Sequence, residues 1–294
     1  QYILDNIQIA IYNKNRIIRE INSYPNIPTI SQFLENNGQD IRTLYQSNNC
    51  WTSLKRAAGR IAYKDDVITK RLEKGMANLL HHNTASFLHF IELFIDGSKQ
   101  YLDTKNYKYA LMLYYALFQD RLDKTGFASI YEALELIHKE MYSYFRQEIS
   151  EIISYLLAHL QLKTMPLGED VLPGLELYGC YTREEIFTLA GRQTEARKMQ
   201  GSVTGVFNLS EHNATLLFVT LNKSDKDFSP STQYNDYLIN EHYFHWQSQN
   251  TDSHQNNGGQ RYTKQADTQN KIILFVREEK KDGYGILVLS IVLV

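Results

Sequence analysis

The residues between Leu216 and Tyr262 combine aromatic rings with amide and carboxylate side chains at high density. Stacking surfaces beside planar hydrogen-bonding groups are what a pocket needs to hold a nucleobase. The same residues would also suit an aromatic core with a polar rim, and the pattern alone leaves both interpretations open. The candidate base-binding residues are Tyr234, Asp236, Tyr237, His245, Trp246, Gln247 and Gln249.

The group Tyr234, Asp236 and Tyr237 has the chemistry to read a cytosine edge. A carboxylate accepts a hydrogen bond from the exocyclic amine of cytosine, and two aromatic rings can sandwich the base. The alternative is that Asp236 caps a turn while both tyrosines belong to the core.

The segment Phe244–Gln249 is expected to be a strand whose two faces differ. Alternation places Phe244, Trp246 and Ser248 on one face, and the intervening His245, Gln247 and Gln249 on the other. One face would join the core, and the other would present amides to a base or to the nucleic-acid backbone. His245 taken alone also suits a structural role, because buried histidines usually satisfy their hydrogen bonds within the fold.

A second set of side chains suits contacts with phosphates. Three of them follow a short expected helix, and the other two follow the polar run 250–259, which we interpret as a mobile loop able to enter a duplex. A solvated basic face is the alternative for the first three. The candidates for backbone contacts are Arg192, Arg197, Lys198, Arg261 and Tyr262.

The overall charge argues against broad electrostatic coating of DNA. The 294 residues include 31 Lys and Arg against 33 Asp and Glu, and from Val171 onward the numbers are 12 against 14. Nucleic-acid binding would therefore depend on a local stripe, or on neighbouring domains that supply affinity.

Cysteine usage and hydropathy point to a reduced, cytoplasmic protein. Cys50 and Cys180 are too few for a disulfide framework or a zinc site. The sequence shows neither a signal peptide nor an apolar run of membrane-spanning length, so we expect no membrane association. The chain opens at Gln1 rather than Met, which suggests a piece of a longer protein.

Several catalytic signatures are absent from the sequence. It has neither a phosphate-binding loop nor a nucleophile elbow. His81-His82 lacks the spacing of a metalloprotease helix, and we expect surface polar residues there; Asp225-Lys226-Asp227 reads as a solvated turn. We therefore expect this chain to be non-enzymatic and to hold no metal or cofactor of its own.

The sequence predicts an α+β protein with two domains, a helical one over 1–168 and a β-rich one over 169–294. Apolar periodicity in the first half predicts an irregular helical bundle, and Thr182 with Glu185 predicts a capped helix over Arg183–Ala190. In the second half, short strand signals predict a curved sheet or barrel. The expected strands are Val203–Leu209, Thr215–Leu221, Asp236–Leu238, Tyr243–Gln249, Lys271–Val276 and Ile286–Leu293.

Three segments give the chain a resemblance to a known family. They are LNKSDKDFSPSTQYNDYLINEHYFHWQSQ (221–249), GGQRY (258–262) and IILFVRE (272–278). Over roughly 177–285 the chain resembles the C-terminal region of SauUSI-like ATP-dependent type IV restriction enzymes, which cut DNA containing modified cytosine. These enzymes join a phospholipase-D-type nuclease, a helicase and this region in one polypeptide.

The resemblance implies a helical coupler followed by a target-recognition domain with a fold like SRA domains, which flip a methylated cytosine out of the duplex. It implies 5-methylcytosine or 5-hydroxymethylcytosine in double-stranded DNA as ligand, the helicase and nuclease domains as partners, and ATP with a divalent metal for the parent enzyme. The family usually has more residues between the LFVRE strand and the terminal strand, so either this chain is shortened or residues are missing between Gly285 and Ile286. The alternative function is a protein-interaction or regulatory module without modified-base specificity; a self-contained hydrolase is disfavoured by the absent motifs.

Overall fold

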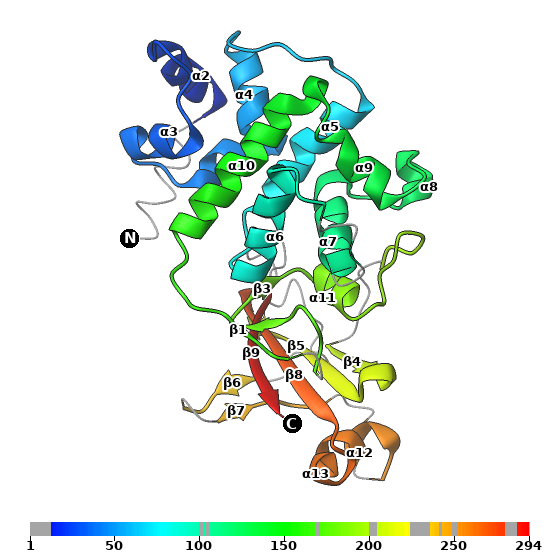
Figure 1. Ribbon diagram of the computed structural model, residues 1–294. Coiled ribbons are helices and arrows are strands. Elements are labelled where there is room, and N and C mark those ends of the chain that lie inside the picture. Colours follow the sequence, from blue (N-terminus) through cyan, green and yellow to red (C-terminus); the bar gives the residue numbers. More distant parts are fainter. Residues whose placement is uncertain are drawn as a thin grey trace. The chain divides into compact units, whose positions relative to one another are not determined.

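The chain divides into two compact units, which are described separately below (Figure 1). The helical unit comprises Gln1–Gln161 with Thr194–Lys198, and the sheet unit comprises Leu162–Gln193 with Met199–Val294. The sequence predicts the boundary at 168/169, whereas the main boundary between the units lies at 161/162. The computed structural model describes residues 13–99, 103, 106–168, 171–199, 205–223, 236–240, 243–248, 252–253, 255–279 and 287–293.

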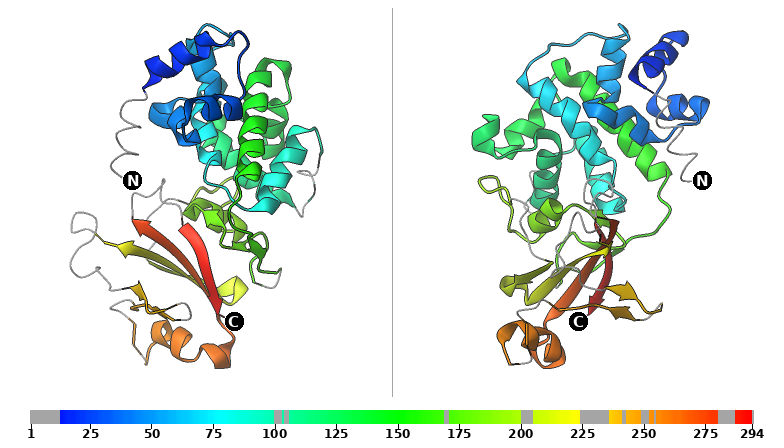
Figure 2. Two further views of the ribbon diagram at one scale, coloured as in Figure 1. Left: turned by 90° about the vertical axis from the view of Figure 1, so that its left-hand side faces the viewer. Right: turned by 180° about the vertical axis from the view of Figure 1, so that it is seen from behind.

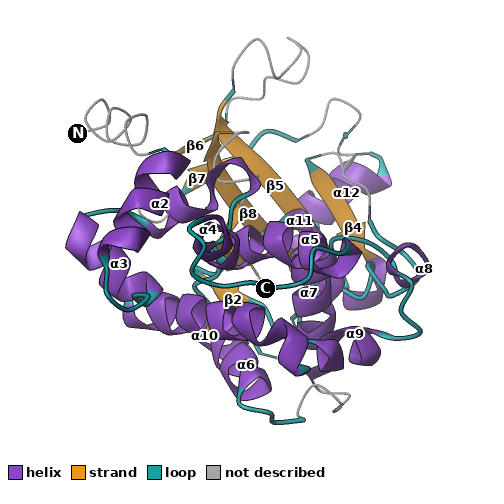
Figure 3. Cartoon of the chain, turned by 90° about the horizontal axis from the view of Figure 1, so that it is seen from above, coloured by secondary structure: helices purple, strands orange, loops and turns teal. Residues whose placement is uncertain are grey.

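The expected helical first half is confirmed. The helix α10 packs against α6 and α3, and Figure 3 shows these helices in purple. The core of this unit contains Phe33, Trp51, Phe87 and Phe145, all fully buried. The elements are α2 (Lys14–Ser23), α3 (Ile30–Asn37), η1 (Ile41–Asn48), α4 (Trp51–Ala57), α5 (Val67–Gly75), η2 (Met76–Leu79), α6 (Ala85–Ile95), α7 (Tyr107–Phe118), α8 (Leu122–Thr125), α9 (Ile130–Leu136), η5 (Glu140–Tyr142) and α10 (Ser143–Ala158).

Glu148, on α10, holds the beginning of α4. Its carboxylate oxygens accept hydrogen bonds from the backbone N–H groups of Trp51 and Thr52, each at 2.7 Å, and its side chain is fully buried. The first N–H groups of a helix lack partners within the helix, and a carboxylate also interacts favourably with the positive end of the helix dipole. One buried acid therefore fixes how α4 docks on α10.

The segment Thr194–Lys198 belongs to the helical unit although the residues on both sides of it belong to the sheet unit. The hydroxyl of Tyr107 donates to the Glu195 carboxylate at 3.0 Å, and the hydroxyl of Tyr115 donates to the Thr194 carbonyl at 2.7 Å. The ammonium of Lys198 donates to the carbonyl of Gln119, at the C-terminal end of α7. These bonds fasten the segment to α7.

The sheet unit is built on a five-stranded sheet with the order β3-β9-β8-β5-β4. The long strands β5 (Ala214–Asn222) and β8 (Lys271–Glu279) are parallel, and their neighbours are antiparallel (Figure 2). The sheets of the described residues are not closed into a barrel, so the barrel alternative of the prediction is wrong. The remaining elements are β1 (Met165–Pro166), β2 (Glu176–Leu177), β3 (Cys180–Tyr181), α11 (Arg183–Leu189), β4 (Val206–Leu209), η6 (Ser210–His212), β6 (Tyr237–Leu238), β7 (Phe244–His245), α12 (Asn257–Thr263), α13 (Gln265–Thr268) and β9 (Leu287–Leu293).

The predicted helix after Thr182 is confirmed. Thr182 and Glu185 form the expected capping box at α11, and Gly191 follows the helix with φ +72°. The ring of Phe187, on α11, lies 4.8 Å from Phe207 and 6.1 Å from Phe218. Helix α11 therefore covers one face of the central sheet, where Phe218 stacks on Phe275.

The described parts of the expected strands lie where the sequence predicts them, whereas β1, β2 and β3 are not among the expected strands. The strand expected over Tyr243–Gln249 is regular only at Phe244–His245. The sequence predicts a loop over 250–259. In the structure, helix α12 already begins at Asn257, and the side chain of Asn256 caps it. A β-carbon on Gly259 would lie 2.1 Å from the Ser253 carbonyl oxygen, so this close approach of two backbone segments requires glycine there.

Candidate nucleic-acid interface

The hairpin β6–β7 carries the most exposed aromatic groups among the candidate residues. Tyr237 pairs with His245 across the hairpin, and their rings stack with centroids 4.8 Å apart and planes 29° apart. Tyr237 is 45% exposed, and Tyr243, at the turn, is 66% exposed. The hairpin therefore presents a flat pair of rings to solvent.

Asp236 lies just before β6 and is engaged within the unit. One oxygen of its carboxylate accepts from the ammonium of Lys223 at 2.7 Å, and the other accepts from the backbone N–H of Gln247 at 2.9 Å. The side chains of Asp236 and Lys223 are only 5% and 10% exposed. This buried ion pair ties the hairpin to the end of β5, and a cytosine amine would have to share the carboxylate with these two donors.

The alternation expected along Phe244–Gln249 is confirmed for its described residues. His245 and Gln247 are exposed, whereas Phe244 and Trp246 pack against the buried cluster of Leu217, Val219 and Leu274. This is the face of the sheet opposite Phe218. Trp246 therefore anchors the hairpin to the sheet rather than standing free.

Tyr262 lies on α12 and meets Trp246 edge-on, with ring centroids 4.8 Å apart. Burial raises the pKa of the Tyr262 hydroxyl to about 12. Helix α12 is held in turn by Asn270, whose side-chain amide donates to Thr215 at 3.1 Å and to the carbonyl of Arg261 at 3.5 Å. Tyr262 therefore packs against Trp246 and helps to hold its ring in place. Arg261, on the same helix, is partly exposed.

The basic candidates after α11 have different partners and belong to different units. Arg192 pairs with Glu211 at 2.6 Å and lies over the Phe207 ring in the sheet unit. Arg197 is exposed and Lys198 is bound to Gln119, and both belong to the helical unit. The candidates Tyr234 and Gln249, with Asp225-Lys226-Asp227, lie outside the described residues.

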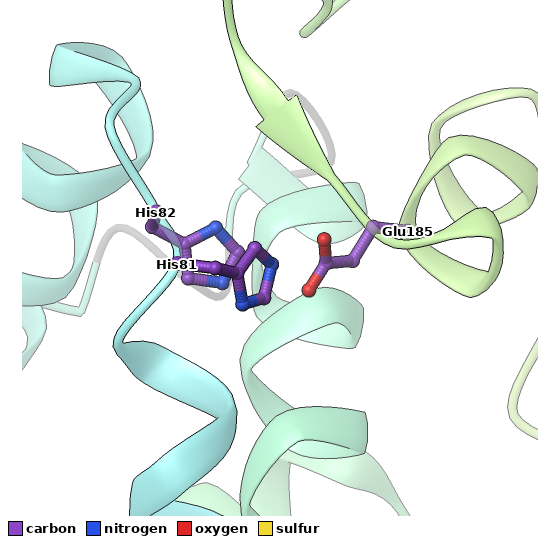
Figure 4. Close-up of side chains that lie close together, drawn as sticks. All are labelled: His81, His82 and Glu185. Carbon is purple, nitrogen blue, oxygen red and sulfur yellow. The ribbon is translucent and has the colours of Figure 1, made fainter. Parts of the chain in front are cut away.

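The histidine pair was misjudged from the sequence. His81 and His82 follow η2 with ring centroids 4.0 Å apart (Figure 4), but His82 is buried and meets the edge of Phe87 at 4.6 Å. It is a packed residue of the helical unit rather than a surface one. Glu185, also drawn in Figure 4, serves the sheet unit by closing the capping box of α11.

Sequence reasoning missed two arginines on the α11 side of the sheet. The guanidinium of Arg183 lies 4.6 Å from the centre of the Phe218 ring, and Nε of Arg277 donates to the Thr220 hydroxyl at 2.9 Å. The register pairs Thr220 with Arg277, and Phe218 is two residues before Thr220 on the same strand. Only the parallel pairing of β5 with β8 brings these distant residues together.

A family model described as a domain of unknown function (DUF3427) matches residues 175–286. This domain is found in helicase-associated proteins. The match covers most of the sheet unit and nearly the same residues as the resemblance noted in the sequence. No curated protein matches the chain. Among the described residues, no helix has both the length and the apolar character needed to cross a membrane.

Proposed function

We propose that this chain recognises 5-methylcytosine or 5-hydroxymethylcytosine in double-stranded DNA by base flipping, as the specificity module of a type IV restriction endonuclease. The observation that carries the proposal is the exposed ring pair of Tyr237 and His245 on an anchored hairpin. The sequence resemblance and the helicase association of the matching domain give it context. The sheet unit would be the SRA-like recognition domain, and the helical unit the coupler to the motor.

The ring pair supplies the interaction that a flipped base loses. Extruding a base costs a few kcal/mol of stacking and pairing, and an aromatic ring returns about 1–3 kcal/mol per stacked base. The return is largest when the rings are already ordered, because little conformational entropy remains to be lost. The cross-strand pairing of Tyr237 with His245 and the anchor at Asp236 provide that order.

The methyl group sets a limit on selectivity. One methyl contributes about 0.8 kcal/mol by transfer, and about 1–3 kcal/mol in a tightly fitting apolar site. The module alone would therefore prefer modified cytosine by roughly ten- to a hundredfold. Higher selectivity would come from contacts with flanking bases or from the ATP-dependent step of the parent enzyme.

The test compares duplexes that differ only in one cytosine. We expect tighter binding of the 5-methylcytosine duplex in fluorescence anisotropy at each point of a salt series. Tyr237→Ala should lower affinity for that duplex by roughly five- to 150-fold, the equivalent of about 1–3 kcal/mol, whereas the control Tyr237→Phe keeps the ring and its affinity. Equal affinities for both duplexes at all salt concentrations would contradict the proposal.

A protein-interaction module is the second candidate, favoured by one observation. Ile239 and Tyr243 are exposed beside Tyr237, and a protein partner could cover these apolar groups. This candidate predicts equal, weak affinity for both duplexes. Under it, Tyr243→Ala would weaken binding of purified helicase domain without changing DNA binding.

We expect the isolated chain to lack nuclease and ATPase activity. The reason is that its sequence contains neither a phosphate-binding loop nor a nuclease signature. With magnesium present, the purified chain should leave methylated plasmid intact and release no phosphate from ATP. The parent enzyme would cleave the plasmid and hydrolyse ATP. Metal-dependent cleavage that co-purifies with the chain and disappears in a Tyr237→Ala variant would contradict this expectation.

A further inference from the structure

The ring pair of Tyr237 and His245 is bordered on its turn side by a second pair of residues. The backbone N–H of Ile239 donates to the carbonyl of Tyr243 at 2.9 Å, so these two residues face each other across the hairpin. Side chains alternate along a strand, so Ile239 lies on the same face as Tyr237. In the same way, Tyr243 lies on the face of His245. Ile239 is 57% exposed. An exposed apolar side chain therefore lies directly beside the stacked rings.

The opposite border of the ring pair is polar. Gln247 follows His245 by two residues on the same face, and it is exposed. Its backbone N–H donates to Asp236 at 2.9 Å, which fixes its position beside the hairpin. A side-chain amide can both donate and accept hydrogen bonds. The exposed face thus carries an apolar group at one end, stacking rings in the middle and an amide at the other end.

Cytosine carries the same order of chemistry across its ring. Its amine, N3 and O2 form hydrogen bonds, whereas C5 and C6, on the side away from N3 and O2, are apolar. Two residues along a strand span about 6.6 Å, so the side chains at both borders can reach the edges of a base centred on the rings. A base stacked on Tyr237 with its hydrogen-bonding groups toward Gln247 directs its 5-substituent at Ile239. The face therefore matches a pyrimidine that is modified at C5.

We propose that Ile239 contacts the 5-substituent of the stacked base and selects 5-methylcytosine over both cytosine and 5-hydroxymethylcytosine. The inference rests on the proposed function and deepens it, since that function does not distinguish the two modified bases. A methyl group that packs on Ile239 leaves water with a gain in free energy. A hydroxymethyl group would have to give up hydrogen bonds with water, and an isoleucine side chain offers none in return. Ile239 is thus a specificity-determining residue.

The first experiment measures affinity for three duplexes that differ only in one base, which is cytosine, 5-methylcytosine or 5-hydroxymethylcytosine. The wild-type chain should bind the 5-methylcytosine duplex most tightly. Ile239→Ala should reduce its preference over the cytosine duplex by about fourfold or more, the effect of burying one CH₂ group, and leave affinity for the cytosine duplex unchanged. Leu221→Ala, which removes another exposed apolar side chain from the sheet unit, is the matched control and should change neither value. A folded Ile239→Ala variant with the wild-type preference would overturn the inference.

The second experiment shifts the preference between the two modified bases, which loss of folding cannot do. Ile239→Thr keeps the branched shape and adds a hydroxyl that can bond the hydroxymethyl group. The affinity for the 5-hydroxymethylcytosine duplex should therefore rise relative to that for the 5-methylcytosine duplex. An unchanged ratio of the two affinities would contradict a contact with the 5-substituent.

The outcomes separate this inference from the proposed function. Equal affinities of the wild-type chain for all three duplexes would contradict the proposed function, and the role of Ile239 with it. A methyl preference that survives both substitutions of Ile239 would contradict only the role of Ile239. Weaker binding of purified helicase domain by Ile239→Ala, with DNA binding unchanged, would overturn the inference in favour of a protein partner.

Discussion

Replacing Asp236 with alanine is expected to release the β6–β7 hairpin from the sheet. The substitution leaves the Lys223 ammonium in a place where it is only 10% exposed, and it removes the acceptor of the Gln247 N–H. Breaking a buried ion pair from one side costs about 3–5 kcal/mol. A hairpin whose two strands have only two residues each, packed on one apolar cluster, has too little stability of its own to offset such a loss. Amide hydrogen exchange measured by mass spectrometry should therefore accelerate over residues 236–248.

The double variant Asp236→Ala with Lys223→Met separates the two roles of the carboxylate. It leaves no buried charge, so most of the lost protection should return, with a residual cost of about 1–3 kcal/mol from the unbonded N–H. A folded double variant that has lost its methyl preference would assign base reading to Asp236. A folded double variant that keeps the preference would assign it a positioning role. Unchanged hydrogen exchange in Asp236→Ala would contradict the importance of the pair.

Replacing Glu148 with alanine is expected to destabilise the helical unit strongly. Two backbone N–H groups at the beginning of α4 would lose a buried, charged acceptor. Hydrogen bonds to charged groups contribute about 1.5–3 kcal/mol each, so the free energy of unfolding should fall by about 3–6 kcal/mol. Glu148→Gln keeps one acceptor oxygen and should lose roughly half as much.

The unfolding of the helical unit can be followed separately by tryptophan fluorescence. The chain has two tryptophans, Trp51 in the helical unit and Trp246 in the sheet unit. In a Trp246→Phe background, urea unfolding followed by fluorescence reports on Trp51 beside the substitution. Glu135→Ala on α9 is the control, because its ion pair with Lys99 is exposed and worth at most about 1 kcal/mol. Equal midpoints for the Glu148→Ala and Glu135→Ala variants would contradict the prediction.

Local signals predicted the helices well. Apolar periodicity in the first half predicts its helical bundle, and the Thr182 capping box gives the first residue of α11. Such signals work because capping and amphipathic spacing act within a few residues. The alternation along β7 likewise placed Phe244 and Trp246 on the core side.

The contacts that define the candidate site are non-local and could not be predicted in the same way. The polar composition before Arg261 is typical of a loop. In the structure, however, Gly259 allows two backbone segments to approach closely at the beginning of α12. The partner of Asp236 is a lysine 13 residues earlier, and Arg277 meets a residue of β5 that is 57 positions away. Pairings of this kind depend on strand order and register, which no short sequence pattern specifies.

The five residues Thr194–Lys198 bear on how such a protein could evolve. A recombination that exchanged everything after Gln161 would deliver a new sheet unit together with a new segment 194–198, and Tyr107 and Tyr115 of the old helices would have to bind that segment. A breakpoint after Lys198 would keep these contacts but would separate β3 and α11 from the strands on which they pack, so exchange of the sheet unit should require paired changes in α7. During synthesis, likewise, the helical unit cannot complete its contacts until the ribosome has passed Lys198, by which time α11 has already been made.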